Sequence, residues 1–159
     1  FAVALEGKSI DGTAEAIVRA ASWVVHEDPL NIPEQLVDRF ALATIFYANG
    51  GDSWTNSNGW LSNKSICDGW YGISCYFSSE KIEEIDLSRN NLHGEIPEVL
   101  TLLLEVRVLW LNNNALLGRI PGEIVGSMPM LGILYMQGNQ LTGPIPAAVQ
   151  NNGVLRKLL

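Results

Sequence analysis

The sequence predicts an α/β fold, a right-handed solenoid whose short parallel strands line a concave face, preceded by a helical cap that carries a disulfide. Two observations lead to this expectation. A unit of similar sequence occurs three times in the second half of the chain, and its asparagines, Asn90, Asn114 and Asn139, are spaced by 24 and 25 residues. Other residue types recur in phase with them, which is typical of stacked structural repeats. Two segments with helical periodicity and a pair of cysteines precede the first unit.

Residues 13–26 form the first predicted helix, with Thr13 placed to cap its N-terminus. The second predicted helix spans residues 33–48, with Pro33 in its first turn and Gly50 as its stop. The apolar positions expected to face the core are Ile17, Ala20, Ala21, Val24 and Val25 in the first helix and Leu36, Val37, Phe40, Ile45 and Phe46 in the second. We expect both helices to cover the open edge of the first repeat, because an uncovered strand invites pairing with other chains.

The two cysteines, Cys67 and Cys75, are eight positions apart and lie among tryptophans. A disulfide between them would restrict the unfolded chain and add about 2 to 3 kcal/mol to the stability. A zinc site would need more ligands, and neither His26 nor His93 has acidic or cysteine companions at ligand spacing. We therefore expect a disulfide, no metal ion and no cofactor, with both histidines at the surface.

Each repeat begins with a short strand, in which apolar residues alternate with polar or aromatic ones. The strand residues predicted to point into the coil are Ile85 and Leu87, Leu109 and Leu111, and Leu134 and Met136. The return path of each coil is predicted to add Leu92, Leu116 and Leu141, and then Ile96, Ile120 and Ile145, to the same interior. One repeat cannot bury this surface alone, so the repeats must stack on each other.

Polar and conformationally special residues mark the corners of each repeat. Asn90, Asn114 and Asn139 follow the strands, where a buried amide is tolerated only if neighbouring backbone groups satisfy it. We expect these three asparagines to form a stacked ladder. The glycine at the next corner allows a positive φ, and the proline after it suits a segment that donates no backbone hydrogen bond.

These elements divide the chain into three parts. Residues 1–50 form the helical segment of the cap, residues 51–80 form the disulfide hairpin, and residues 81–159 hold three complete repeats and the start of a fourth at Leu155. The sequence begins at Phe1 without a methionine, which indicates a processed or partial polypeptide.

The L-x-G-x-I-P pattern in LHGEIP, LLGRIP and LTGPIP resembles the plant-type extracellular leucine-rich repeat family, and the similarity covers residues 42–159. The segment DSWTNSNGWLSNKSICDGWYGISC is similar to the cysteine-bearing N-terminal cap of that family, with one extra residue between Cys67 and Trp70. Residues 23–54 more closely resemble the region ahead of the repeats in leucine-rich repeat proteins of diatoms and related algae. The resemblance implies a solenoid whose concave face recognises proteins, and in some members carbohydrate or ice.

In this architecture the strand side chains on the concave face are free to bind a partner, because the coil interior takes the others. The predicted partner-binding residues are Glu84, Asp86 and Ser88 in the first strand, Val108, Trp110 and Asn112 in the second, and Ile133, Tyr135 and Gln137 in the third. Asp86, Trp110 and Tyr135 fall in one column, so the two aromatic residues should lie about 5 Å apart on neighbouring strands. Exposed aromatic residues are typical of binding hot spots. Alternatively, the two rings only pack against each other or are covered by an unseen segment of the polypeptide.

Composition and motifs argue against several other functions. A net charge of -7 and a pI near 4.7 disfavour nucleic acid as a partner. No apolar stretch reaches the roughly 18 to 20 residues of a membrane span. The chain lacks G-x-S-x-G, H-E-x-x-H and a phosphate-binding glycine loop. Glu83, Glu84 and Asp86 read as a solvated acidic patch, so we do not expect an enzyme.

We therefore expect a non-enzymatic protein-recognition module or a subunit of a larger complex. The alternatives are a secreted protein that binds carbohydrate or ice, or an inhibitor of an enzyme that degrades cell walls. An ice binder would need flat, regular rows of threonine or aromatic residues, to which the repeats contribute only Thr142.

The cysteine pair and the sequon Asn63-Lys64-Ser65 favour a secreted protein in an oxidising, extracellular compartment, with N-glycosylation predicted at Asn63. A plastid or thylakoid lumen is the alternative location, because Phe1-Ala2 resembles the processing junction of algal plastid proteins.

Overall fold

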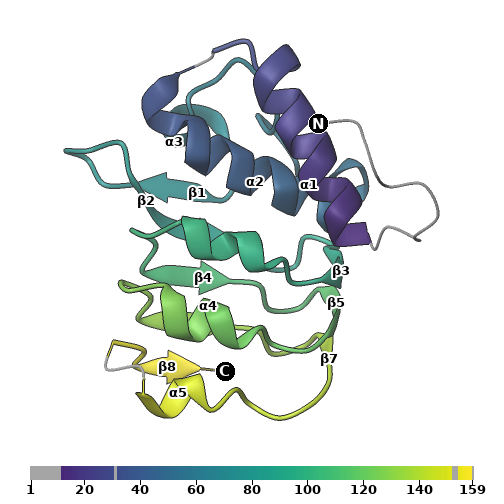
Figure 1. The fold of residues 1–159 in the computed structure, drawn as a ribbon, viewed down its shortest axis with the longest axis vertical. Coiled ribbons are helices and arrows are strands. Elements are labelled where there is room, and N and C mark those ends of the chain that lie inside the picture. The colour runs from purple at the N-terminus through teal and green to yellow at the C-terminus, as the bar shows by residue number, and fades with distance from the viewer. Residues whose placement is uncertain (1–11, 31, 152–153, 159) are drawn as a thin grey trace.

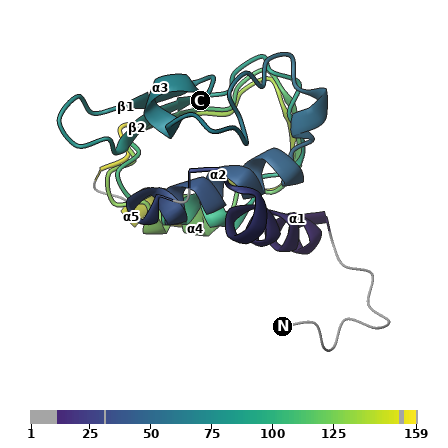
Figure 2. The ribbon, with the colours of Figure 1, turned by 90° about the horizontal axis from the view of Figure 1, so that it is seen from above.

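The computed structural model describes residues 12–30, 32–151 and 154–158. The chain forms a short solenoid with the cap at one end of its long axis and the last strand at the other (Figure 1). Seen along this axis, the coils superpose, with the main strands on one side and the helices on the other (Figure 2). The features noted at Phe1 and Ala2 lie outside the described residues.

The concave face is the outer side of a five-stranded sheet. Its strands are β1 (Ile73–Cys75), β2 (Ile82–Asp86), β4 (Val108–Trp110), β6 (Ile133–Tyr135) and β8 (Lys157–Leu158), in that spatial order. β1 pairs with β2 in antiparallel orientation, and all later neighbours are parallel. Each repeat contributes one strand, so the predicted α/β solenoid is confirmed.

A second parallel sheet on the flank of the solenoid was not predicted. It consists of β3 (His93–Glu95), β5 (Ala115–Gly118) and β7 (Gln140–Leu141). These strands contain or precede the recurring glycine, and a Cβ built on Gly118 would lie 3.0 Å from the Glu95 side chain of the preceding coil. Strands of two to four residues are too short to show an alternating pattern, which explains why the sequence did not reveal this sheet.

The return path of each coil carries one short helical turn after the proline. These turns are η4 (Glu98–Leu102), α4 (Gly122–Ser127) and α5 (Ala148–Asn151). They line up on the side opposite to the concave sheet, in series with the second helix of the cap (Figure 2). The proline fits there because it opens a helical turn without needing an N–H donor.

An aliphatic column fills the coils. All six strand residues predicted to point inward are buried, as are Leu92, Leu116 and Ile96, whereas Ile120 and Leu141 are half-buried. The prediction was wrong for Ile145, which is 63% exposed. In a stacked array, an isoleucine at this position of the return path is covered by the following coil. Past the third repeat the described residues provide only the short stretch 154–158.

The corner asparagines bond to backbone groups of adjacent coils. Asn114 Oδ1 accepts hydrogen bonds from the N–H groups of Asn90 and Leu92, and its Nδ2 donates to carbonyls on two coils. Asn139 bonds in a similar way one coil further along. Asn90 exchanges two hydrogen bonds with the backbone of Asn56 in the cap. The amides therefore link the cap to the third repeat.

Two helical segments form the outer layer of the cap. α1 (Gly12–Ser22) continues into a π-helical turn at Trp23–Glu27, and α2 (Leu36–Ala48) follows a 3₁₀ turn at Pro33–Gln35. These positions lie close to the predicted ranges 13–26 and 33–48. Gly50, with a φ of 71°, ends the second helix in the left-handed conformation that glycine favours.

The buried faces of the helices match the predicted ones only in part, at Ala20, Val24, Ile45 and Phe46. Ala16, Ala20, Trp23 and Val24 are buried in the first segment and residues 41–46 in the second. Phe40 is half-buried, and the predicted core positions Ile17, Ala21, Val25, Leu36 and Val37 are exposed. α1 packs on α2 through a narrow row of alanines, which leaves its larger apolar side chains outside the contact.

Aromatic side chains fill the interior of the cap. The ring centroid of Trp60 lies 4.8 Å from that of Trp54 and 5.1 Å from that of Trp70. Trp23 packs edge-on against Trp70, and Phe46 of α2 against Trp54. The remaining elements of the cap are η3 (Gly51–Ser53) and α3 (Ile66–Gly69). Cys67 and Cys75 form the predicted disulfide and join α3 to β1.

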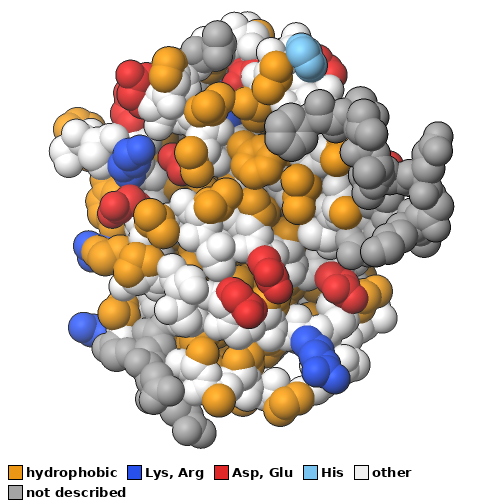
Figure 3. Space-filling view, viewed as in Figure 1, with side chains coloured by type: hydrophobic (Ala, Val, Ile, Leu, Met, Phe, Trp, Pro, Cys, Tyr) orange, Lys and Arg blue, Asp and Glu red, His pale blue; other side chains and the backbone are white. Residues whose placement is uncertain are grey.

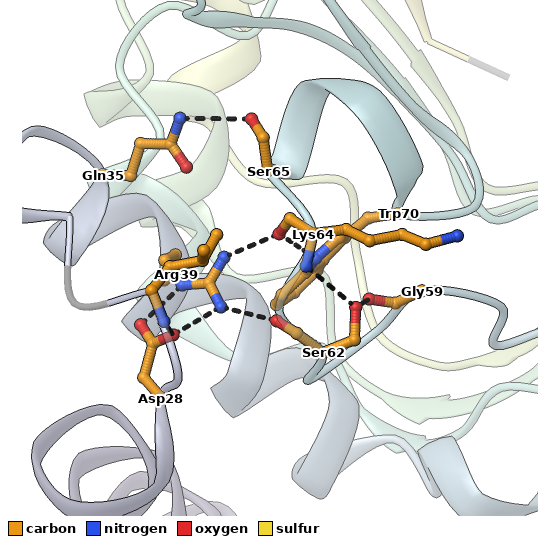
Figure 4. Close-up of polar contacts among 9 residues, drawn as sticks. Asp28, Gln35, Arg39, Gly59, Ser62, Lys64, Ser65 and Trp70 are labelled. Carbon is orange, nitrogen blue, oxygen red and sulfur yellow. Dashed lines mark hydrogen bonds and ion pairs between the residues drawn. The ribbon is translucent and has the colours of Figure 1, made fainter.

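A buried arginine holds the cap together. Arg39 of α2 is fully buried, and its Nε and Nη2 each lie 2.6 Å from a carboxylate oxygen of Asp28. It also donates to the carbonyls of Ser62 and Lys64 (Figure 4). Its guanidinium carbon lies 5.1 Å from the ring centroids of both Trp23 and Trp70. One side chain therefore joins the first helical segment, the second helix and the disulfide-bearing loop.

Across the part of the chain that the structure describes, no helix has both the length and the apolar character needed to cross a membrane.

Candidate functional site

The parallel register places the predicted binding residues in columns across the concave face. One column runs from Asp86 through Trp110 to Tyr135, and a second runs from Glu84 through Val108 and Ile133 to Lys157. Parallel strands align these residues because their repeats have nearly equal length.

Trp110 and Tyr135 form an aromatic stack. Their ring centroids are 4.1 Å apart and the ring planes differ by 18°. Trp110 Nε1 donates a hydrogen bond to Glu84 Oε1 at 2.5 Å, and Lys157 Nζ lies 5.1 Å from the Tyr135 ring centroid. A carboxylate on one side and an ammonium on the other thus hold the stack in place.

The stack is partly open. Trp110 and Tyr135 are both half-buried, as are Val108 and Ile133 in the neighbouring column. The two rings therefore do pack against each other, as one of the two sequence interpretations expects. They still present an apolar surface on the outer side of the sheet, flanked by the strand residues of the next column.

The acidic side of this face lies next to the cap. Asp86 is exposed, and its Oδ1 accepts hydrogen bonds from the backbone N–H and the hydroxyl of Ser88, at 3.0 and 2.7 Å. Glu84 is half-buried because it turns toward Trp110. Gln137, beyond the end of β6, is exposed. Carboxylates and aromatic rings therefore share one open surface.

Asn112 departs from the expectation that it is free to bind. It is only 8% exposed, and its Oδ1 is buried without a hydrogen-bond partner among the described residues. Asn113, with a φ of 58°, turns the chain sharply into the coil. The strand has thus begun to leave the sheet at this point, which draws the preceding side chain inward.

The remaining predicted site residues lie in the cap or on the flank. Asn63 is exposed in a loop between the two carbonyls that bind Arg39. His26 and His93 are both exposed, and His93 packs over Gly50. Among the described residues, no group of three or more His, Cys, Asp or Glu side chains is arranged to hold a metal ion.

Comparison with known proteins agrees with this architecture. Residues 81–103 and 130–152 match the family model described as Leucine Rich Repeat. Each match covers one coil, from its concave strand through the helical turn of its return path.

The curated relatives include plant receptor-like kinases. A probable leucine-rich repeat receptor-like serine/threonine-protein kinase from Arabidopsis thaliana is 28% identical over 141 residues, which is 88% of this chain and 14% of the relative. A second such kinase from the same plant, RPK1, is 37% identical over 123 residues, or 63% of this chain and 22% of the relative. The chain therefore spans well under a third of the length of these relatives.

Several solved plant proteins are similar to this chain in structure. The BIR3–SERK2 complex from Arabidopsis thaliana matches with 36% identity and a TM-score of 0.57 over 68% of this chain and 56% of that chain. A plant ice-binding protein matches with 28% identity and a TM-score of 0.66 over 74% and 37%. The Arabidopsis receptor kinase HAESA, in complex with the peptide hormone IDA and the co-receptor SERK1, matches with 25% identity and a TM-score of 0.56 over 93% and 21%.

The fold is thus a leucine-rich repeat solenoid. More particularly, its sequence is similar to those of plant leucine-rich repeat receptor-like kinases. The described residues form the repeat solenoid and its cap, and hold no kinase domain.

Proposed function

We propose that this chain recognises a partner protein through its concave face, centred on Trp110 and Tyr135. The observation that carries the proposal is the aromatic stack itself. It lies on the outer side of the five-stranded sheet, where both rings are half-buried. Tryptophan and tyrosine contribute a large contact area with little loss of side-chain entropy, which is why they dominate binding hot spots.

The charges around the stack indicate how a partner would be oriented. Glu84 and Asp86 lie on the cap side of the aromatic pair, and Lys157 lies on the far side. A segment crossing the strands would therefore meet acidic groups, then an apolar centre, then a cation. Such an arrangement favours a partner with basic residues toward the cap, since complementary charge fixes the orientation of binding.

The comparisons support a recognition role. Two of the similar structures contain leucine-rich repeat proteins in complex with other proteins or with a peptide hormone. We infer the same general role for this chain, without enzymatic activity in the solenoid, and place it outside the cell on the same grounds. The relationship of its cap to proteins of diatoms and algae, and the glycan at Asn63, stay predictions.

The proposal is tested by replacing both aromatic side chains. Trp110→Ala/Tyr135→Ala should lower capture of partner proteins from extracts of the producing cells at least tenfold, because the hot spot is lost. The control, Tyr71→Ala, removes an exposed aromatic side chain from the cap and should leave capture unchanged. Circular dichroism must show that the double variant stays folded. Undiminished capture by a folded double variant would contradict the proposal.

Ice binding is the second candidate, because the chain shares its fold and 28% identity with a plant ice-binding protein. The described surface argues against it. The concave columns mix carboxylates, aromatic rings and a lysine, and the flank sheet exposes His93, Glu95 and Leu117 rather than a row of threonines. An ice-recrystallisation assay decides the matter, and we expect no inhibition above that of an inert protein.

A further inference from the structure

A second surface lies on the outer side of the cap, where the cap meets the first repeat. A cavity of about 280 Å³ opens between the start of α2, the entry into β2 and the end of η4. A neighbouring hollow of about 480 Å³ lies between the turn before α2 and the β1–β2 hairpin, and the two share Glu34 and Lys81. We call this continuous feature the cap groove. It is lined from within residues 32–38, 78–82 and 102–106.

The cap groove exposes large apolar side chains. Val37 and Leu104 are each 53% exposed and Leu102 is 41% exposed, while Phe77 at the tip of the neighbouring hairpin is fully exposed. In Figure 3 hydrophobic side chains are mixed with acidic and basic ones along this edge, below the projecting β1–β2 hairpin. An apolar surface rimmed by charges is typical of an interaction site.

The charges of the cap groove are unbalanced. Glu34, Asp38, Glu80 and Glu105 lie along it, with Lys81 as the one cation. The described residues contain a single ion pair, between Arg39 and Asp28, so none of these four carboxylates pairs with another described residue.

Two observations indicate that an added cation would be favourable in the cap groove. Burial raises the pKa of Asp38, an effect that the Lys81 ammonium partly offsets and the Glu105 carboxylate increases. Gln35, only 5% exposed, lines the second hollow, and its Oε1 has no hydrogen-bond partner in the described part of the chain. An added cation would favour the charged form of Asp38 and supply a donor for Gln35 Oε1.

We propose that the cap groove binds a basic segment of a partner protein in which a lysine or arginine lies between aliphatic side chains. The cation meets the carboxylates of Glu34, Asp38 and Glu105, and the aliphatic neighbours cover Val37 and Leu104. A nucleic acid or an anionic membrane is repelled by the same carboxylates, and a second copy of this chain carries the same net charge of -7. The cap groove shares no residue with the predicted concave-face site, so the two proposals are independent.

A short fluorescein-labelled peptide of alternating leucine and arginine is a suitable probe, with fluorescence anisotropy as the measurement. Peptides with glutamate in place of arginine, or glycine in place of leucine, are the controls on the ligand side. We expect the leucine–arginine peptide to bind at least tenfold more tightly than either control, because both the charge and the apolar contact contribute. Equal binding of the glutamate peptide would overturn the proposal.

Two matched variants locate the binding. Glu34→Gln/Glu105→Gln should weaken binding of the peptide at least tenfold, which corresponds to about 1.4 kcal/mol. Glu15→Gln/Glu123→Gln makes the same charge change at exposed carboxylates outside the groove and should alter affinity less than about twofold. Equal weakening by both pairs means only general attraction to an acidic protein and rejects the cap groove. Sedimentation gives a second way to reject the proposal. The proposal fails if the wild-type chain self-associates and Glu34→Gln/Glu105→Gln abolishes this self-association.

Discussion

Two asparagines near one corner of the second repeat show how strongly position determines the role of a buried amide. Asn114 uses its carbonyl and its amino group to bond five backbone groups, distributed over the first two coils. Asn112, two residues earlier, is also buried, but its Oδ1 has no partner in the described structure. The sequence predicted the first role, because an asparagine recurs at this position in every repeat. It could not predict the second, since a local turn of the chain decides it.

Replacing Asn114 with alanine leaves several buried backbone groups without partners. Because each such group costs about 1 to 3 kcal/mol, we expect Asn114→Ala to lower the free energy of unfolding by at least 3 kcal/mol. Asn58→Ala, at an exposed asparagine whose side chain makes none of the hydrogen bonds found in the described structure, should change it by less than about 0.5 kcal/mol. Urea denaturation measures both, and similar losses in the two variants would show that the ladder adds little.

Asp38 gives a prediction about pH. Its pKa is raised above the ordinary 3.8 because burial disfavours the charged form. The folded chain therefore binds this proton more tightly than the unfolded chain, and the associated stability is present at low pH and lost as pH rises through the folded pKa. Asp38→Asn carries no charge at any pH. The variant should melt at a higher temperature than the wild type at neutral pH.

This advantage of Asp38→Asn should disappear at acidic pH, where the wild-type carboxyl is protonated as well. Asp68→Asn, at an exposed position, serves as the control and should not reproduce the effect. If Asp38→Asn melted at or below the melting temperature of the wild type at neutral pH, this result would contradict the raised pKa of Asp38. The same variant should also weaken binding of the basic peptide to the cap groove, which separates its effect on stability from its effect on recognition.

At the scale of elements, the features that repeat regularly were predictable, and the packing inside the cap was not. The strands and their interior residues followed from the period-two pattern, repeated at 24 to 25 residues. The helix ranges followed from apolar spacing and Pro33. The buried faces followed only in part, because the contact between α1 and α2 uses alanines, while Leu36 is exposed and Val37 lies at the cap groove. Arg39 was missed, although a single arginine within an apolar helix is a signal of a buried ion pair.

Arg39 therefore carries a prediction at this scale. Arg39→Met leaves Asp28, whose side chain is 1% exposed, as an uncompensated buried charge. Loss of one partner from such a pair costs about 3 to 5 kcal/mol, so the melting temperature should fall sharply. The double variant Arg39→Met/Asp28→Leu removes both charges and should recover part of this loss. If the double variant were no more stable than the single one, the uncompensated charge of Asp28 would not be the cause of the loss.

At the scale of the whole molecule, the solenoid separates two open surfaces. The concave columns could be predicted because repeats of nearly equal length bring equivalent residues side by side, as Asp86, Trp110 and Tyr135 show. The stacking of the two rings and their contacts with Glu84 and Lys157 needed the structure. The cap groove could not be predicted at all, since it joins three segments that are distant in sequence.

Photocrosslinking from single positions tests the concave-face proposal most directly. A photoreactive amino acid at Gln137 would report on the concave face, and one at Leu117, 44% exposed on the flank sheet, would serve as the matched control. In extracts of the producing cells, we predict a reproducible protein adduct from position 137 that disappears in Trp110→Ala/Tyr135→Ala and is absent from position 117. Equal adducts from both positions, or an adduct at position 137 that survives loss of the aromatic pair, would contradict recognition through the concave face.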